Sequence, residues 1–135
     1  MRILTCLAVF FSLTVFAADS KEIAKVGVVF VDEGTFELAL VRYGDPSENT
    51  YLAEISGVDD PLNGKVLKVR ATGGGTSATY YEREGGGNLL RAPQHQYFGW
   101  EAYLGNKTFK INQDTKKTKA LKTETVLAKY LKGKK

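Results

Sequence analysis

Apolar and polar residues alternate over short stretches along most of the chain, and polar or glycine-rich segments separate these stretches. Residues 36–43 (FELALVRY) and 65–72 (KVLKVRAT) show this alternation, which is the period of a strand with one buried face. Residues 25–31 (KVGVVFV) are nearly all apolar or β-branched, which also favours a strand. The pattern predicts about seven strands, at residues 25–31, 36–43, 51–56, 65–72, 76–84, 97–104 and 107–112.

Turn residues join several of these strands into hairpins. Asp32 to Thr35 connect the first two strands, and Gly105-Asn106 forms a two-residue turn between the last two. Residues 123–131 (TETVLAKYL) change to helical spacing, with Leu127 and Leu131 four positions apart. We therefore predict a mainly β fold: a small antiparallel β-barrel or sandwich of about seven strands with a short C-terminal helix. The helix would close an end or cover a sheet edge.

The first segment of the chain differs from the rest. Arg2 precedes an apolar run of about sixteen residues, which is shorter than the roughly 20 residues that a membrane-spanning helix needs. The run ends in the small residues Ala17-Ala18, and charged residues follow at once. These features predict a cleavable signal peptide over residues 1–17, followed by a single β-rich domain, 18–135, with a basic C-terminal helix and tail. The alternative is an uncleaved N-terminal anchor.

Export determines which chemistry the domain can use. A signal peptide predicts a periplasmic or secreted protein. The one cysteine, Cys6, lies in the predicted signal, so the exported domain would have no disulfide, no Cys–His zinc site and no catalytic thiol. The one histidine, His95, has no second histidine for metal binding, and residues 59–64 match a calcium loop poorly. We predict no metal and no cofactor.

Charge is divided unevenly along the predicted domain. Residues 18–104 hold eight Lys and Arg against thirteen Asp and Glu, whereas residues 105–135 hold ten Lys against two acidic residues. A basic terminus favours anionic partners. Because an exported domain does not meet chromosomal nucleic acid, we expect weak contact of the lysine-rich tail with an anionic membrane or lipopolysaccharide, and no nucleic acid. The alternative is a solvated lysine surface without a partner.

The sequence carries no catalytic signature. No serine lies in a Gly-x-Ser-x-Gly motif, and the glycine triplet at residues 73–75 lacks the lysine of a phosphate-binding loop. We therefore predict a non-enzymatic domain with no catalytic residues. One alternative is a small envelope hydrolase or transferase that uses Glu82 or Glu84 with His95. Another is a structural accessory subunit of an envelope complex.

Aromatic side chains provide the candidate binding surface. Alternation places Trp100 on one face of its strand and Tyr97 and Tyr103 on the other. An exposed set would stack on a sugar or fill a pocket of a partner, whereas the alternative is that both sets are core. The predicted binding residues are Ser77, Tyr80, Tyr81, Tyr97, Trp100 and Tyr103. The predicted partner is a protein or glycan of the cell envelope.

Residues 77–81 (SATYY) are similar to the Ser-Gly-x-x-Tyr loop of the periplasmic lysozyme inhibitors. These are small exported β-barrels that insert a Ser and a Tyr into the cleft of a cationic enzyme, and Ser77 and Tyr81 stand at the matching positions. Ala78 replaces the glycine, and the Lys-Gly motif of that family does not follow Trp100. The resemblance covers five residues of 135 and does not assign the chain to that family. It implies an inhibitor-like function for an acidic domain that faces a basic partner.

Overall fold

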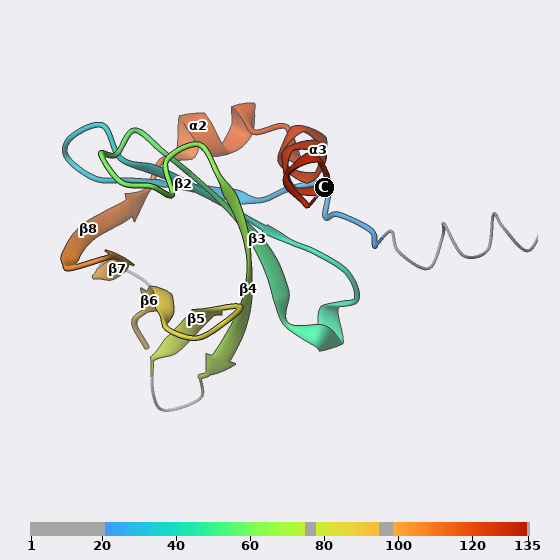
Figure 1. Ribbon diagram of the computed structural model, residues 1–135, viewed down its shortest axis with the longest axis horizontal. Coiled ribbons are helices and arrows are strands. Elements are labelled where there is room, and N and C mark those ends of the chain that lie inside the picture. The colour runs from blue at the N-terminus through green and yellow to red at the C-terminus, as the bar shows by residue number, and fades with distance from the viewer. Residues whose placement is uncertain (1–20, 75–77, 95–98, 135) are drawn as a thin grey trace, which may run out of the picture.

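The strands follow one another around a closed antiparallel barrel, and the last strand returns to pair with the first (Figure 1). The computed structural model describes residues 21–74, 78–94 and 99–134. Within these residues the eight strands are β1 (Val28–Val31), β2 (Glu37–Arg42), β3 (Thr50–Ser56), β4 (Val66–Gly73), β5 (Thr79–Arg83), β6 (Asn88–Ala92), β7 (Trp100–Leu104) and β8 (Lys107–Gln113). The predicted signal peptide, residues 1–17, lies outside the described residues.

The predicted mainly β fold is confirmed, and the barrel alternative is the one that forms. The strand that was not predicted is β6. Its two leucines, Leu89 and Leu90, are adjacent in sequence and both fully buried, so the segment shows no alternation of apolar and polar residues. The pairing of β5 with β6 shifts register between Tyr81 and Glu82. Such a bulge breaks the period of two that identifies strands in a sequence.

Both predicted hairpins are present. β1 and β2 pair up to Val31 and Glu37 around the turn at residues 32–36, and β7 and β8 pair up to Leu104 and Lys107. Gly105 has a φ of 58°, the left-handed conformation that a two-residue turn requires. The first and last strands then close the barrel, with Val31 opposite Asn112.

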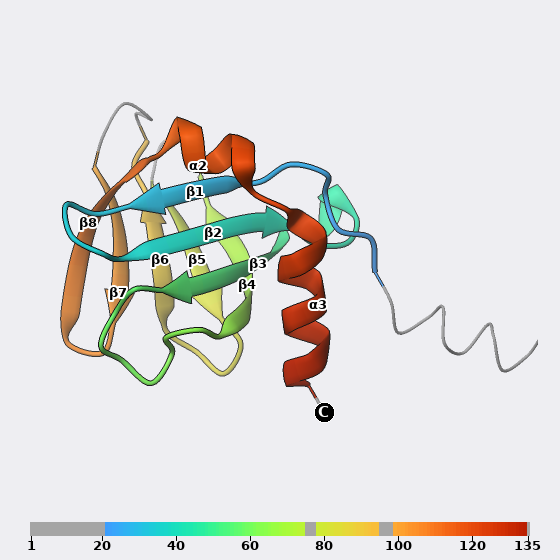
Figure 2. The ribbon, with the colours of Figure 1, turned by 90° about the horizontal axis from the view of Figure 1, so that it is seen from above.

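The two helices pack on the outer wall of the barrel (Figure 2). Helix α2 (Thr115–Ala120) lies against β1, and helix α3 (Thr123–Gly133) lies against β3 and β4. The expectation that the helix closes an end or covers a sheet edge is therefore wrong, since a closed barrel leaves no free edge of the usual kind. Instead α3 covers apolar side chains that the strands turn outward. The outer core consists of Val41, Tyr43, Leu52, Val126 and Tyr130.

The apolar face of α3 also differs from the predicted one. Val126 and Tyr130 are buried against the barrel wall, and the ring centroids of Tyr130 and Tyr43 lie 5.6 Å apart in an edge arrangement. Leu131, which the spacing placed on this face, is 38% exposed. A helix turns by about 100° per residue, so the face centred on positions 126 and 130 carries Leu131 away from the wall.

Part of the predicted basic tail is neutralised by the barrel itself. Lys117 of α2 forms an ion pair with Glu37, and Lys129 of α3 forms one with Glu54. The hydrogen bond to Glu37 raises the pKa of Lys117. The acidic body and the basic C-terminus therefore complement each other within one molecule, which leaves fewer lysines for an anionic surface. No helix in the described ranges is long and apolar enough to span a membrane.

Candidate functional site

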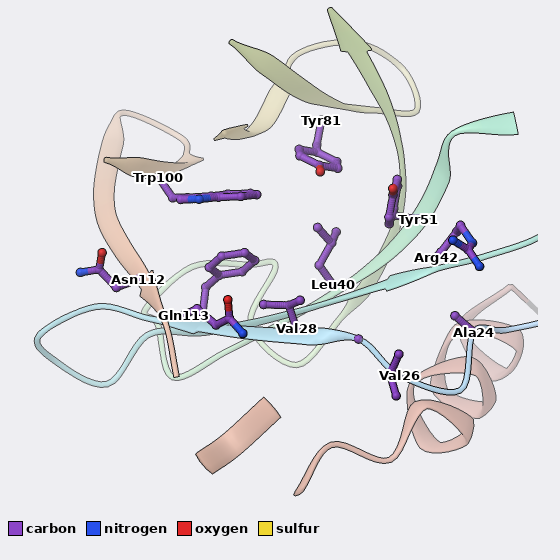
Figure 3. A pocket seen from close by; sticks show the side chains of 12 residues that line it. Ala24, Val26, Val28, Leu40, Arg42, Tyr51, Tyr81, Trp100, Asn112 and Gln113 are labelled. Atoms are coloured by element: carbon purple, nitrogen blue, oxygen red, sulfur yellow. The ribbon is translucent and has the colours of Figure 1, made fainter. Parts of the chain in front are cut away.

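The two ends of the barrel are filled differently. At the end where β2 and β8 begin, the rings of Phe36 and Phe109 are stacked with centroids 4.6 Å apart, and Phe36 is only 1% exposed. At the other end, where β2 and β8 stop, a cavity of about 620 Å³ opens to solvent (Figure 3). We call this cavity the aromatic cup. Its wall is formed by Val28, Phe30, Leu40, Tyr51, Tyr81 and Trp100.

Strand alternation explains why these side chains meet. On β2, Leu38, Leu40 and Arg42 share the inward face, and their exposure rises from 0% at Leu38 to 6% at Leu40 and to an exposed Arg42. The strand thus passes from the closed core to the open rim. The register places Val28 of β1 opposite Leu40 and Tyr51 of β3 opposite Arg42, so neighbouring strands contribute to the same level of the cup.

Aromatic rings from four strands form a continuous chain around the cup. The ring centroids of Phe30 and Trp100 are 4.5 Å apart, and those of Trp100 and Tyr81 are 6.2 Å apart in a stacked arrangement. Tyr81 in turn meets Tyr51 edge to face at 5.3 Å. In Figure 3 the side chains of Trp100, Tyr81, Tyr51, Leu40 and Val28 surround the open space. Such rings offer flat apolar surfaces for contact with a ligand.

The polar groups of the cup are few. The Tyr81 and Tyr51 hydroxyls, the Trp100 indole and the Gln113 amide are neutral, and Arg42 is the only charged side chain among the described lining residues. Burial, with a smaller effect of Tyr51, raises the pKa of Tyr81 to about 12, so its hydroxyl stays protonated near neutral pH. No carboxylate or imidazole is found among the described lining residues. The polar groups that line the described part of the cup are therefore neutral hydroxyls and amides, the Trp100 indole and the Arg42 guanidinium.

Because its hydroxyl is buried, Tyr81 should lower the stability of the folded protein at alkaline pH. Its pKa in the folded protein, about 12, lies above the ordinary value of 10.0, so folding strengthens proton binding at this hydroxyl. The contribution of Tyr81 to stability is complete below about pH 10 and is lost as the pH rises toward about 12. Two pKa units correspond to roughly 2–3 kcal/mol, and we expect Tyr81→Phe to remove about 2 kcal/mol of that alkaline loss.

Urea unfolding at about pH 8 and about pH 11.5 measures this difference. The natural protein should lose more free energy of unfolding between the two conditions than Tyr81→Phe does. Equal losses in both proteins would show that the Tyr81 proton is not held by burial.

The four predicted binding residues that the structure describes do not share one surface. Tyr81 and Trp100 meet in the aromatic cup, whereas Tyr80 and Tyr103 lie on the outer wall. There Tyr103 donates a hydrogen bond of 2.9 Å to Glu101, and desolvation together with this bond raises the pKa of Tyr103 to about 12. The remaining two predicted residues, Ser77 and Tyr97, lie outside the described residues.

The two carboxylates of the alternative catalytic set do not line the cup either. Glu82 and Glu84 lie in a groove on the wall formed by β4 and β5. Glu82 accepts a hydrogen bond of 3.1 Å from Thr72, and Glu84 lies 3.4 Å from Lys68. His95 is outside the described residues. In the same described ranges, no three His, Cys, Asp or Glu side chains come together as a metal site would require.

Four of the six wall residues of the cup were not predicted as binding residues from the sequence. Val28, Phe30, Leu40 and Tyr51 were expected only as strand residues, because alternation shows that they share a face and not which strands lie beside them. Arg42 carried a usable signal: it continues the inward positions of Leu38 and Leu40, where a charged side chain marks the point at which the strand leaves the core.

Comparison of the chain with protein-family models, with curated proteins and with solved structures found no match.

Proposed function

We propose that this protein is a non-enzymatic binding protein of the cell envelope, exported by residues 1–17, whose aromatic cup holds a small apolar molecule. The observation that carries the proposal is the difference between the two barrel ends: one is packed with side chains, and the other is an open cavity of about 620 Å³. Ligand sites are typically concave, of about 300–1,000 Å³, and lined by apolar and aromatic side chains with few polar groups. An eight-stranded barrel is just wide enough to hold one small ligand.

The outer wall supports a binding role less well. Tyr103 and Arg91 both interact with Glu101, the arginine at 3.8 Å, so these polar groups already have partners within the protein. The predicted protein or glycan partner remains a second proposal for this wall. The enzyme alternative is weakened in the same way, because Glu82 and Glu84 contact Thr72 and Lys68.

The single tryptophan of the chain, Trp100, is a built-in reporter because it lines the cup. We expect the neutral apolar dye N-phenyl-1-naphthylamine to bind, with increased dye fluorescence and quenching of Trp100. Val28→Phe would fill the cup from its wall and should weaken binding about tenfold, which corresponds to about 1.4 kcal/mol. Val31→Phe is the matched control, since it adds the same volume to β1 at a position outside the cup wall.

Both variants are first compared with the natural protein by thermal unfolding, so that a loss of binding is not mistaken for a loss of folding. The control should bind the dye within about twofold of the natural affinity. Unchanged Trp100 fluorescence at saturating dye, or equal weakening in both variants, would contradict binding in the cup.

A further inference from the structure

Among the described residues that line the aromatic cup, Arg42 alone carries a positive charge, and it lies at the rim. Arg42 is the last residue of β2 and is exposed, on the inward face that also carries Leu38 and Leu40. It lies directly opposite Tyr51 in the pairing of β2 with β3. Figure 3 shows it at the edge of the space that Tyr51 and Leu40 border. The same strand thus supplies apolar contact inside the cup and a positive charge at its mouth.

The charge of Arg42 is not neutralised within the described part of the chain. None of the ion pairs formed by described residues includes Arg42. The nearby acid is Asp45, whose carboxylate accepts hydrogen bonds of 2.9 Å and 2.8 Å from the backbone N–H and the hydroxyl of Ser47. These bonds lower the pKa of Asp45, and the charge of Arg42 adds a smaller effect. The Asp45 carboxylate therefore makes its hydrogen bonds within the turn that follows β2.

The other polar groups of the cup can donate hydrogen bonds, so they suit a ligand that carries a hydrogen-bond acceptor. The hydroxyls of Tyr51 and Tyr81 and the indole N–H of Trp100 can each donate a hydrogen bond, and the side-chain amides of Asn112 and Gln113 can donate as well as accept. A planar guanidinium can hold a carboxylate or a phosphate through two parallel hydrogen bonds. An anion at the rim would meet Arg42 and the neighbouring Tyr51 without facing a carboxylate of the cup wall.

Apolar surface continues past the rim. Val26, in the segment just before β1, also borders the cup and is 79% exposed, the most exposed large apolar side chain in the described residues. A ligand with an apolar body would cover this side chain as well as the rings inside the cup. Burial of that surface would favour binding in proportion to the apolar area removed from water.

We infer that the ligand of the aromatic cup is an amphipathic anion, whose apolar body lies among Trp100, Tyr81 and Tyr51 and whose carboxylate or phosphate head is bound by Arg42. This inference rests on the proposed function, because it names the class of molecule that the cup takes. A neutral apolar molecule would gain the contacts of the wall alone, whereas a cationic head would be repelled by Arg42.

The test compares ligands that share one alkyl chain and differ in the head. Undecanoate, decyl phosphate and decanol, which share a ten-carbon alkyl chain, are titrated into the full chain, and binding is followed by Trp100 fluorescence. We expect both anions to bind about tenfold more tightly than decanol at moderate salt. The anion that binds more tightly identifies the head group that the rim prefers.

Arg42→Gln should remove this preference by weakening both anions about tenfold while leaving decanol within about twofold. Arg70→Gln is the matched control, since Arg70 is an exposed arginine of β4 in the groove of the outer wall. It should change none of the three affinities. Failure of all three ligands to bind would contradict the proposed function itself, whereas equal binding of decanol and the anions would overturn only the role of Arg42.

Discussion

Replacing Gly57 by alanine should destabilise the barrel strongly, by on the order of 4 kcal/mol. A Cβ atom at this position would lie 1.8 Å from the backbone oxygen of Thr35, and the φ of Gly57 is 72°. The contact is with backbone, which cannot move aside as a flexible side chain would. The same two segments are joined by a hydrogen bond of 2.6 Å from the Thr35 hydroxyl to the Gly57 carbonyl, so the substitution would separate two loops at the closed end.

Gly64 provides a matched control in the same connection between β3 and β4. Its φ is 81°, similar to that of Gly57, but no atom lies within 4 Å of the position that an alanine Cβ would take there. Gly64→Ala should therefore cost only the strain of a left-handed backbone, about 1–2 kcal/mol. Urea unfolding followed by Trp100 fluorescence measures both variants. Similar losses in the two would show that the loop at Gly57 moves apart without difficulty.

Phe36→Ala should cost about 3–5 kcal/mol of the free energy of unfolding, the usual range when a large buried aromatic side chain is removed. Phe36 is 1% exposed and stacks on Phe109 with an interplanar angle of 12°, so its removal leaves a cavity that the rigid barrel wall cannot fill. Val26→Ala is the control: its side chain is 79% exposed, and we expect a change within about 0.5 kcal/mol.

Phe36→Ala also tests whether stability and ligand binding depend on opposite ends of the barrel. Phe36 lies at the closed end of the barrel, whereas the cup opens at the other end, where Arg42 ends β2. Under conditions in which Phe36→Ala is still folded, its affinity for N-phenyl-1-naphthylamine should stay within about twofold of the natural value. A large loss of affinity in folded protein would contradict the division of the barrel into a packed end and a binding end.

This division gives each end a distinct physical role. The closed end holds the fold together through fully buried side chains such as Leu38, Ile55 and Leu104. The open end keeps aromatic rings partly accessible, which costs the barrel some hydrophobic stabilisation. Proteins commonly accept such a local cost where a site must remain free for a ligand.

The sequence by itself determined the local structure. Alternation at residues 36–43 and 65–72, and the turn residues at 32–35 and 105–106, are properties of neighbouring positions, and they predicted strands and hairpins that the structure contains. Leu89 and Leu90 were missed because a bulged strand with two adjacent buried residues shows no alternation.

Only the tertiary structure decided where the candidate site lies. Trp100, Tyr81, Tyr51 and Phe30 come from four different strands, and it is barrel closure and strand register that bring their rings together. Alternation predicted that Trp100 and Tyr103 point to opposite faces, but not which face is the interior. The physical reason is that side-chain direction along a strand is local, whereas closure, register and the packing of α3 depend on contacts between residues far apart in the chain.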